Sequence, residues 1–366
     1  MDPLTPQDLK RYQRHLVLGE VGEAGQRKLK AARVLIVGAG GLGSPSALYL
    51  AASGVGTLGL VDLDTVDVTN LQRQVLYSTA DIGRGKTAAA RQRLIALNPD
   101  LNVIEHGVEL GPDNVMEIFR QYDIVLDGTD RIGTRYLVND ACVLLAKPLV
   151  SAAIHRFEGQ AMTYVPGKGP CYRCLFPAPS TEIPNCATAG VLGVLPGVLG
   201  TLQATEAIKL IIGIGSPLVG RLLTYDALDL SFREFAFKRS TDCAVCGDAP
   251  TITAPSDADR PAGEVRTLSP RELQTLLRET ARLPALIDVR DPEEFATGHL
   301  PGARNIPVNE LERRLAEVTT EVDVVFICMS GKRSQAACAV ALRGGIRAPG
   351  HLEGGMLAWE AVRGDG

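Results

Sequence analysis

Residues 33–62 read RVLIVGAGGLGSPSALYLAASGVGTLGLVD. A short apolar run rich in β-branched residues, 33–37, leads into the glycine cluster 38–43, and a helix of small residues is predicted over 44–53. A second apolar run, 57–62, follows. Strand, glycine turn, helix and strand within about thirty residues form a βαβ unit, so this stretch predicts an α/β fold with a mostly parallel sheet.

The rest of the chain predicts two domains. The first, 1–249, continues the alternation; strands are predicted at 123–127 and 148–152 and a helix at 86–97. The segment 250–264 is poor in large apolar residues and rich in Pro, Ala and Asp, which indicates a linker. The remaining 265–366 is long enough for a second, small α/β domain. Its strands are predicted at 285–289 and 322–328, and its helices at 271–279, 310–317 and 334–342.

Composition excludes several classes of protein. Of 366 residues, 45% are hydrophobic and 22% charged, which is too apolar for a disordered chain. A net charge of -4 argues against a basic nucleic-acid-binding surface, so no direct nucleic-acid partner is expected. The start, MDPLTPQDLK, lacks the features of a signal peptide, and the uncharged stretch 183–205 is interpreted as loop and buried helix rather than a membrane span. A cytoplasmic protein without membrane contact is therefore expected.

The glycine cluster indicates a nucleotide site. Gly38, Gly40 and Gly43 fit GxGxxG between a strand and a helix, where backbone N–H groups hold a phosphate. Asp62 lies at the end of the second strand, where a carboxylate accepts hydrogen bonds from ribose hydroxyls. Alone, this pattern is typical of an NAD site or another adenine nucleotide site. The structural alternative is a tight turn that holds no ligand.

Charged residues at later strand ends favour a triphosphate over NAD. Arg73 and Lys86 would neutralise phosphates and a departing pyrophosphate, and Asp130 would hold Mg²⁺. Taken singly, each residue is more simply explained as a solvated surface charge. Their joint placement around one glycine loop favours the ATP site.

At this point the chain resembles the MoeB/ThiF family of ubiquitin-activating-like adenylyltransferases, over residues 4–248. The matching strings are RYQRH (11–15), VGAGGLGSP (37–45), VDLDTVDVTNLQRQ (61–74), RYLVNDAC (135–142), EGQ (158–160) and CYRCLFP (171–177). The resemblance implies a Rossmann-like adenylation domain, ATP with Mg²⁺, and a homodimer. It also implies a ubiquitin-like sulfur carrier protein ending in Gly-Gly as the substrate.

Carried over by position, the resemblance implies a set of ATP-binding residues. Arg14 would reach the phosphates of the neighbouring subunit. Arg131 stands where the family usually has Asn, and Thr69 where it often has Ser. The remaining site would consist of Gly41, Asp62, Thr69, Asn70, Leu71, Gln72, Arg73, Lys86, Asp130 and Arg131.

Four cysteines form two CxxC pairs with metal-ligand spacing. Cys171 and Cys174 form one pair, and Cys243 and Cys246 the other. Two such pairs make a closed tetrahedral zinc site with four thiolates. The alternatives are redox pairs or buried thiols, but neither pair is predicted at the start of a helix after a strand, as a redox CxxC would be. Structural Zn²⁺ that holds the end of the first domain is favoured.

Cys328 is the predicted sulfur-carrying nucleophile. It ends the apolar run VVFIC and begins a loop before the helix predicted from Ser334. Backbone N–H groups, the helix terminus, Lys332 and Arg333 would all lower a thiol pKa. A phosphatase loop needs Cys-x5-Arg, whereas Arg333 follows after four residues, so the tighter loop favours a persulfide. A buried strand-end cysteine is the structural alternative.

This half resembles rhodanese domains over about residues 265–363. The matching strings are LIDVRDPEEFATGHLPGARNIP (286–307) and HLEGGMLAW (351–359). Met329 stands where Arg is common, and Asp288, Arg290 and His299 are interpreted as structural. The persulfide loop would consist of Cys328, Met329, Ser330, Gly331, Lys332 and Arg333.

Three other cysteines divide by context. Cys186 follows a Pro-rich segment, and in the family a cysteine at this point is proposed to attack the acyl-adenylate or to resolve an acyl-disulfide. A loop cysteine without a role is the alternative. Cys142 and Cys338 fall in apolar helical runs and are expected in the core.

The sequence thus predicts a fused adenylyltransferase and sulfurtransferase that gives the carrier a thiocarboxylate. Its sulfur donor would be thiosulfate or a cysteine desulfurase. The pathway that it serves would be that of molybdopterin, thiamin, cysteine or tRNA thiolation. The rivals are an NAD-dependent oxidoreductase with a rhodanese tail, a non-catalytic binding protein, and an activator for ubiquitin-like conjugation to lysine.

Overall fold

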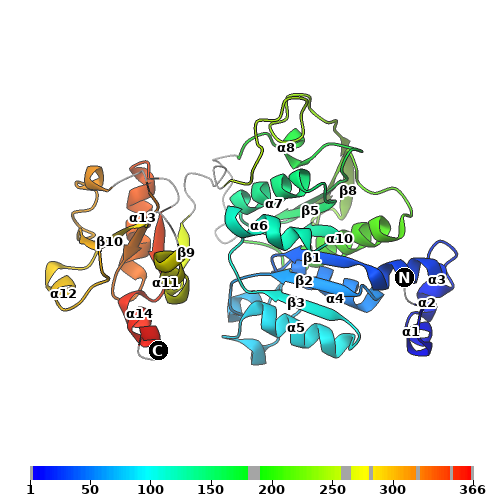
Figure 1. The fold of residues 1–366 in the computed structure, drawn as a ribbon, viewed down its shortest axis with the longest axis horizontal. Helices are drawn as coiled ribbons and strands as arrows, with labels where there is room; N and C mark the ends of the chain where they lie inside the picture. The colour runs from blue at the N-terminus through cyan, green and yellow to red at the C-terminus, as the bar shows by residue number, and fades with distance from the viewer. Residues whose placement is uncertain are drawn as a thin grey trace. The chain divides into compact units, whose positions relative to one another are not determined.

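The chain forms two compact units, Met1–Asp259 and Arg260–Gly366, and each contains one sheet (Figure 1). The computed structural model describes residues 3–179, 190–256, 265–279, 283–318, 322–346 and 349–363. Each unit is described by itself below.

The first unit contains an eight-stranded sheet in the order β3-β2-β1-β4-β5-β6-β7-β8. Strands β3 to β5 are parallel, as predicted, and β5 to β8 continue the sheet antiparallel. The strands are β1 (Arg33–Val37), β2 (Thr57–Val61), β3 (Asn102–His106), β4 (Ile124–Asp127), β5 (Leu149–His155), β6 (Glu158–Tyr164), β7 (Arg221–Asp226) and β8 (Ser231–Ala236).

Helices cover both faces of this sheet (Figure 1). Residues of α3, α4, α5 and α10 pack on one face, and residues of α6 and α7 on the other. The helices are α1 (Pro6–Arg11), α2 (Gln13–Leu16), α3 (Gly22–Ala31), α4 (Gly43–Ser53), α5 (Lys86–Leu97), α6 (Pro112–Arg120), α7 (Ile132–Leu144), α8 (Tyr172–Leu175) and α10 (Leu195–Ile212), with 3-10 turns η1 (Val68–Asn70) and η2 (Thr79–Asp81).

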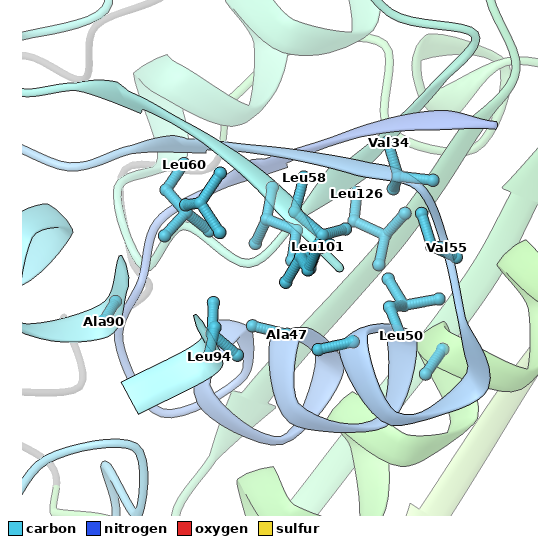
Figure 2. Packing of buried hydrophobic residues seen from close by; sticks show 14 of the residues in the cluster. Val34, Ala47, Leu50, Val55, Leu58, Leu60, Ala90, Leu94, Leu101 and Leu126 are labelled. Carbon is cyan, nitrogen blue, oxygen red and sulfur yellow. The ribbon is translucent and has the colours of Figure 1, made fainter. Parts of the chain in front are cut away.

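The βαβ unit lies in the centre of the first core. Val34 and Ile36 point to the α4 side of the sheet, and Leu35 and Val37 to the α6–α7 side. Figure 2 shows the α4 side, where Leu50 lies against the sheet. Because β1 is buried on both faces from Val34 to Val37, these four residues are all apolar rather than alternating.

The glycine loop depends on close backbone contact. Gly38 has a φ of +87°, a left-handed conformation that favours glycine. A Cβ on Gly43 would lie 2.0 Å from the Gly38 carbonyl oxygen. The GxGxxG pattern therefore allows α4 to begin directly against the end of β1.

Helix α10 is long and apolar enough to cross a membrane by length and composition. It packs against α3, α4 and β5, and Leu195, Leu199 and Ala207 are fully buried there. These contacts are those of a core helix, as predicted for the second half of the uncharged stretch.

The second unit contains a five-stranded parallel sheet in the order β11-β10-β12-β13-β9. Its strands are β9 (Arg266–Leu268), β10 (Ala285–Asp288), β11 (Arg304–Asn305), β12 (Val324–Ile327) and β13 (Gly350–Leu352). Its helices are α11 (Pro270–Glu279), α12 (Pro292–Ala296), α13 (Lys332–Arg343) and α14 (Gly355–Arg363), with the 3-10 turn η3 (Leu315–Glu317).

The helix predicted over 310–317 is wrong. The segment forms turns that end in η3, and Arg313 and Glu317 donate backbone hydrogen bonds to the residue three positions before. Nucleating an α-helix is costly for so few residues. Leu311 is fully buried and holds the segment on the core without a full helix.

Candidate functional site

The glycine loop lies at the carboxyl edge of the first sheet, where β1, β2 and β4 end side by side. Gly38 donates its N–H to the Val61 carbonyl at 2.8 Å, and Gly128 donates to Val37 at 2.9 Å. A Cβ on Gly38 would lie 3.0 Å from the Gly128 oxygen. The loops after these strands therefore touch, and residues from three separate stretches meet at one edge.

Asp62 organises this loop from the end of β2. Its carboxylate accepts hydrogen bonds from the Ala39 N–H at 2.8 Å and the Asp64 N–H at 2.9 Å. Burial raises the pKa of Asp62, while the charge of Lys86 opposes that rise. Asp62 thus fixes the backbone of the glycine loop in addition to its predicted contact with a ribose.

Lys86 is a buried cation, with 5% of its surface exposed. Its Nζ lies 2.8 Å from Asp64 Oδ2 and 3.9 Å from Asp62 Oδ1. The Asp64 side chain is 60% exposed. The Lys86 Nζ thus lies between two carboxylates at the edge of the sheet where the glycine loop begins, and an anion bound at this edge would meet it.

Arg73 borders the glycine loop from the turn that follows η1. Its Cγ lies 3.7 Å from the position that a Cβ on Gly41 would take, and Pro196 of α10 packs on the same side. Its Nη1 donates to the Thr69 carbonyl at 3.0 Å. The structure therefore brings Arg73 and Gly41 together, as the ATP-site prediction requires.

The side chains of Thr69 and Asn70 shape this turn. The Thr69 hydroxyl donates to Asp67 Oδ1 at 2.6 Å, and Asn70 Oδ1 accepts the Asp67 N–H at 3.2 Å. Gln72 is exposed, and a Cβ on Gly193 would lie 2.4 Å from both its main-chain carbonyl oxygen and its Oε1. These three predicted residues position the turn that carries Arg73, and Leu71 is half-buried within it.

A buried ion pair supports the loop after β4. Arg135 Nη1 lies 3.1 Å from Asp127 Oδ2, and Ser151 also donates to Asp127, at 2.9 Å. Burial raises the pKa of Asp127, opposed by Arg135. Asp130 is exposed beyond this pair, and Arg131 Nη1 lies 3.4 Å from Glu109 Oε1.

Arg14 lies near the edge of the sheet opposite to the glycine loop. Its exposed helix α2 follows Tyr12, whose hydroxyl accepts a bond from Asn98 at the C-terminal end of α5. Tyr12 also contacts Gly54 at the C-terminal end of α4. Since the glycine loop is at the other end of α4, about 16 Å away for 11 residues, Arg14 does not join the site of its own chain.

The four cysteines of the CxxC pairs converge in the first unit. Their Sγ atoms all lie within 4.8 Å of one another, with separations of 3.9 Å (Cys171–Cys174), 3.6 Å (Cys171–Cys243) and 3.4 Å (Cys174–Cys246). A tetrahedral Zn²⁺ with Zn–S bonds of about 2.3 Å requires S–S separations of about 3.8 Å. The set therefore fits a zinc ion.

The cluster is supported by its surroundings. The Ser240 N–H lies 3.4 Å from Cys174 Sγ, and Asn139 Nδ2 lies 3.9 Å from Cys171 Sγ. Burial raises the pKa of Cys246 to about 12, so a bound cation is needed to replace its proton at neutral pH. The short helix α8 begins directly after Cys171, so the prediction that neither CxxC pair lies at the start of a helix is wrong for the first pair. The pair does not directly follow a strand, because β6 ends at Tyr164.

The Cys328 loop forms the centre of the second unit's site. Cys328 follows β12 and is 1% exposed; its Sγ lies 3.1 Å from the Gly331 N–H and 3.5 Å from Ser334 Oγ. Gly331 has a φ of +88°. Helix α13 begins at Lys332, two residues before the predicted start at Ser334, and the Lys332 side chain is exposed.

Arg333 faces carboxylates. Its guanidinium pairs with both oxygens of Glu294 at 2.6 and 2.7 Å and lies 3.4 Å from Asp291. This hydrogen-bonded pair lowers the pKa of Glu294 to about 2. The sequence predicts two cations beside the sulfur; the structure assigns one of them, Arg333, to fixing the loop on α12.

The first turn of α14 holds the same loop from its other side. Met356 and Leu357 donate their N–H groups to the carbonyls of Cys328, at 2.8 Å, and Met329, at 3.1 Å. A Cβ on Gly355 would lie 2.2 Å from the Cys328 oxygen. Gly355, the second glycine of the HLEGG string, is therefore required by close backbone approach.

The residues interpreted as structural behave so. Arg290 pairs with Asp288 at 2.7 Å, and both are buried. His299 is exposed and stacks on Phe295. Cys142 and Cys338 lie in the two cores, as predicted, whereas Cys186 lies outside the described residues.

Sequence reasoning missed several supporting residues. Asp64 could have been found from its place two residues after Asp62 in the same string. The Asp127–Arg135 and Glu294–Arg333 pairs join residues of separate elements, so no local sequence pattern predicts them.

Comparison with family models matches residues 12–245 to the ThiF family and residues 269–362 to the Rhodanese-like domain. The chain belongs to the ThiF family. It carries a rhodanese-like domain at its C-terminal end, so both resemblances drawn from the sequence are confirmed.

Relatives match this two-domain chain over most of its length. The probable adenylyltransferase/sulfurtransferase MoeZ of Mycobacterium tuberculosis is 44% identical over 97% of this chain and 94% of its own. The adenylyltransferase and sulfurtransferase MOCS3 of Aedes aegypti is 40% identical over 98% of this chain and 88% of its own. A sulfur carrier protein adenylyltransferase of Thermus thermophilus is 53% identical over 68% of this chain and 94% of its own.

Among solved structures, Escherichia coli MccB in complex with ATP is similar, with a TM-score of 0.57 and 28% identity. The match covers 65% of this chain and 73% of that one. The adenylation fold is thus shared with a protein that binds ATP.

Proposed function

We propose that this chain uses ATP to adenylate the C-terminal glycine of a ubiquitin-like sulfur carrier protein and then transfers sulfur to it from a persulfide on Cys328. One observation carries the proposal: a single chain contains both the Lys86–Asp62 glycine-loop site and the Cys328 loop. Relatives with the same two domains are named for both activities.

The first unit supplies positioning and charge compensation. The carrier's terminal carboxylate attacks the α-phosphorus of ATP, the bond to the β-phosphate breaks, and pyrophosphate leaves. Lys86 and Arg73 would offset the phosphate charge, and the Gly38–Gly43 backbone would bind it. The product is an acyl-adenylate, an anhydride with AMP as a good leaving group.

The second unit supplies the sulfur. Cys328 first attacks the outer sulfur of a donor and becomes Cys–S–SH, while thiosulfate leaves as sulfite or the persulfide of a cysteine desulfurase returns to its thiol. The terminal sulfur attacks the acyl-adenylate, the bond to AMP breaks, and an acyl disulfide forms. A first thiol then attacks the Cys328 sulfur of the acyl disulfide and expels the carrier thiocarboxylate, and a dithiol reduces the resulting disulfide and returns the Cys328 thiol. Cys186 would provide the first of these thiols, leaving a Cys186–Cys328 disulfide that an external dithiol reduces.

Two metals accompany this proposal. Zn²⁺ would be bound by Cys171, Cys174, Cys243 and Cys246, whose sulfur separations fit it. Mg²⁺ would be held by Asp130 and the phosphates and would lessen the charge on the pyrophosphate that leaves.

We also propose that the chain works as a homodimer in the cytoplasm. The dimer is supported by Arg14, which lies at the far end of α4 from its own glycine loop. A second copy would bring its Arg14 to that loop. Mixing Arg14→Ala with Lys86→Ala chains should then restore part of the pyrophosphate exchange that each lacks, because mixed dimers contain one intact site.

The proposed function is tested by pyrophosphate exchange. The full chain, MgATP and a candidate carrier ending in Gly-Gly should incorporate labelled pyrophosphate into ATP. A carrier lacking the last glycine is the control. Transfer of the carrier to a protein lysine instead would identify a conjugating enzyme, and NADH binding without exchange would identify an oxidoreductase.

A further inference from the structure

Gln74 is a buried side chain at the glycine loop without a structural explanation. It is 4% exposed, yet its carbonyl oxygen Oε1 has no hydrogen-bond partner among the residues that the structure describes. An amide carbonyl buried in this way loses its bonds to water and gains none in return, at a cost to stability. Such a group needs a reason to be present.

The Gln74 amide borders the second glycine of the motif. Its Nε2 lies 3.6 Å from the position that a Cβ on Gly40 would take, and among the described residues it is the sole atom that such a Cβ would meet within 4 Å, its chain neighbours aside. In a GxGxxG loop this glycine lets the backbone approach a pyrophosphate closely. The amide is therefore placed where the phosphates of a nucleotide would pass.

The main chain at Gln74 is held firmly. Its N–H donates to the Asn70 carbonyl at 2.9 Å, and its own carbonyl accepts the Tyr77 N–H at 3.1 Å. The Tyr77 hydroxyl then donates to the Ala39 carbonyl at 2.8 Å, which ties the turn to the glycine loop. The position of the amide is thus set by backbone contacts that do not involve the amide itself.

A second buried glutamine shows what a structural role looks like. Gln203 of α10 also has an unpartnered Oε1, but its Nε2 donates to the carbonyls of Asp127, at 2.7 Å, and Val150, at 3.2 Å. Those bonds link α10 to β4 and β5. Gln74 has no such link to a described residue, so packing alone does not account for an amide at this position.

MgATP offers both a hydrogen-bond acceptor for the Gln74 amide N–H and hydrogen-bond donors for its carbonyl oxygen. Phosphate oxygens accept from the amide N–H, and ribose hydroxyls and Mg²⁺-bound waters donate to the amide carbonyl. Resting on the proposed adenylation function, we infer that Gln74 is a further positioning residue of the ATP site, whose side-chain amide binds the nucleotide phosphates beside Gly40. Its role adds to those of Arg73 and Lys86, since it contributes orientation without charge.

Two variants of the full chain test this role. Gln74→Met keeps the volume but removes both hydrogen-bonding groups, and Gln74→Glu keeps the shape but places a carboxylate beside the phosphates. Gln121→Met, on the exposed turn after α6, is the matched control. Each chain is measured for Tm without nucleotide, for MgATP affinity by calorimetry, for KM and kcat of pyrophosphate exchange, and for thiosulfate sulfurtransferase activity.

Gln74→Met should retain or raise the Tm, because an unpartnered polar group has been removed. Its MgATP affinity should fall about tenfold, as expected for a lost hydrogen bond to a charged group. KM for ATP should rise more than kcat falls, Gln74→Glu should be weaker still, and sulfurtransferase activity should be unchanged. Gln121→Met should match the parent.

A lower Tm with unchanged MgATP affinity in Gln74→Met would assign the amide a structural role and overturn the inference. Wild-type affinity in both variants would overturn it equally, while leaving the proposed function intact. A parent chain that binds no MgATP would instead overturn the proposed function, and with it the role of Gln74.

Discussion

The glycine loop of the first unit and the Cys328 loop of the second both connect the carboxyl end of a buried parallel strand to the start of a helix. They are completed in different ways. The glycine loop draws its charged residues from the ends of several strands, including Asp62, Lys86 and Asp130. The Cys328 loop is nearly complete within residues 328–334, with Glu294 and Gly355 holding it in place.

The difference matches the chemistry. Phosphates of a nucleotide spread charge over many oxygens, so their site needs several separated donors and cations. A persulfide is a single sulfur atom beyond Sγ, and backbone N–H groups with one helix terminus suffice for it. The two sites should therefore fail independently, and loss of one should leave the other measurable.

The largest effect is expected from Cys328→Ala. The substitution removes the proposed sulfur-carrying nucleophile, so thiosulfate sulfurtransferase activity and thiocarboxylate formation should both disappear. Pyrophosphate exchange should remain at the parental rate, because the adenylation site lies in the other unit. Residual sulfur transfer above the uncatalysed rate would show that another cysteine carries sulfur.

Lys86→Ala should have the reverse pattern. It leaves Asp62 and Asp64 close to an incoming triphosphate without their buried cation. Pyrophosphate exchange should fall by at least about a hundredfold, on the scale of a lost transition-state donor, while sulfurtransferase activity stays unchanged. Lys147→Ala, away from the glycine loop on the turn before β5, controls for general loss of a lysine. Equal loss of both activities would mean that the units are not independent.

Cys243→Ser should destabilise the first unit selectively. Cys171, Cys243 and Val245 belong to the core that α6 and α7 share with the sheet, so a weakened metal site loosens that core. We expect a loss of about 3 kcal/mol, or about 6–12 °C in Tm for a unit of this size, together with substoichiometric zinc. Cys338→Ser, in the second unit's core, should leave the zinc content unchanged; full zinc content in Cys243→Ser would contradict the four-cysteine site.

The smallest effect is expected from Glu294→Gln, which weakens the bond between the Cys328 loop and α12. The pKa of Glu294 is lowered from 4.5 to about 2 by Arg333, so its contribution is fully present above pH 4.5 and is lost as the pH falls toward 2. Calorimetry should find a difference of at most about 1 kcal/mol between the parent and the variant, since the pair is partly exposed. That difference should be constant from pH 7 to about 5 and shrink below it; a difference that grew on acidification would contradict the pair.

The same contrast explains what could be predicted from the sequence. The βαβ unit, each CxxC pair and the Cys328 loop consist of residues that are close together in the sequence. The structure confirms the strands and helix of the βαβ unit and brings the two CxxC pairs together. The segment 310–317 failed because its charged pairs are also typical of a helix, while turns satisfy them equally well.

Residues that act across the fold could not be predicted. The unpartnered amide of Gln74, the buried Asp127–Arg135 pair and the attachment of Arg333 to Glu294 depend on which strands are neighbours. The antiparallel extension β6 to β8 was missed for a similar reason, since strand order is a property of the whole sheet.

Mass spectrometry of the carrier after incubation with MgATP and thiosulfate tests the central claim most directly. With the parent chain, the carrier's C-terminus should gain the mass difference between one sulfur and one oxygen. With Cys328→Ala it should instead accumulate as an AMP adduct, and with Lys86→Ala it should remain unmodified. A carrier that acquires sulfur without ATP, or with the Lys86→Ala chain, would contradict the account.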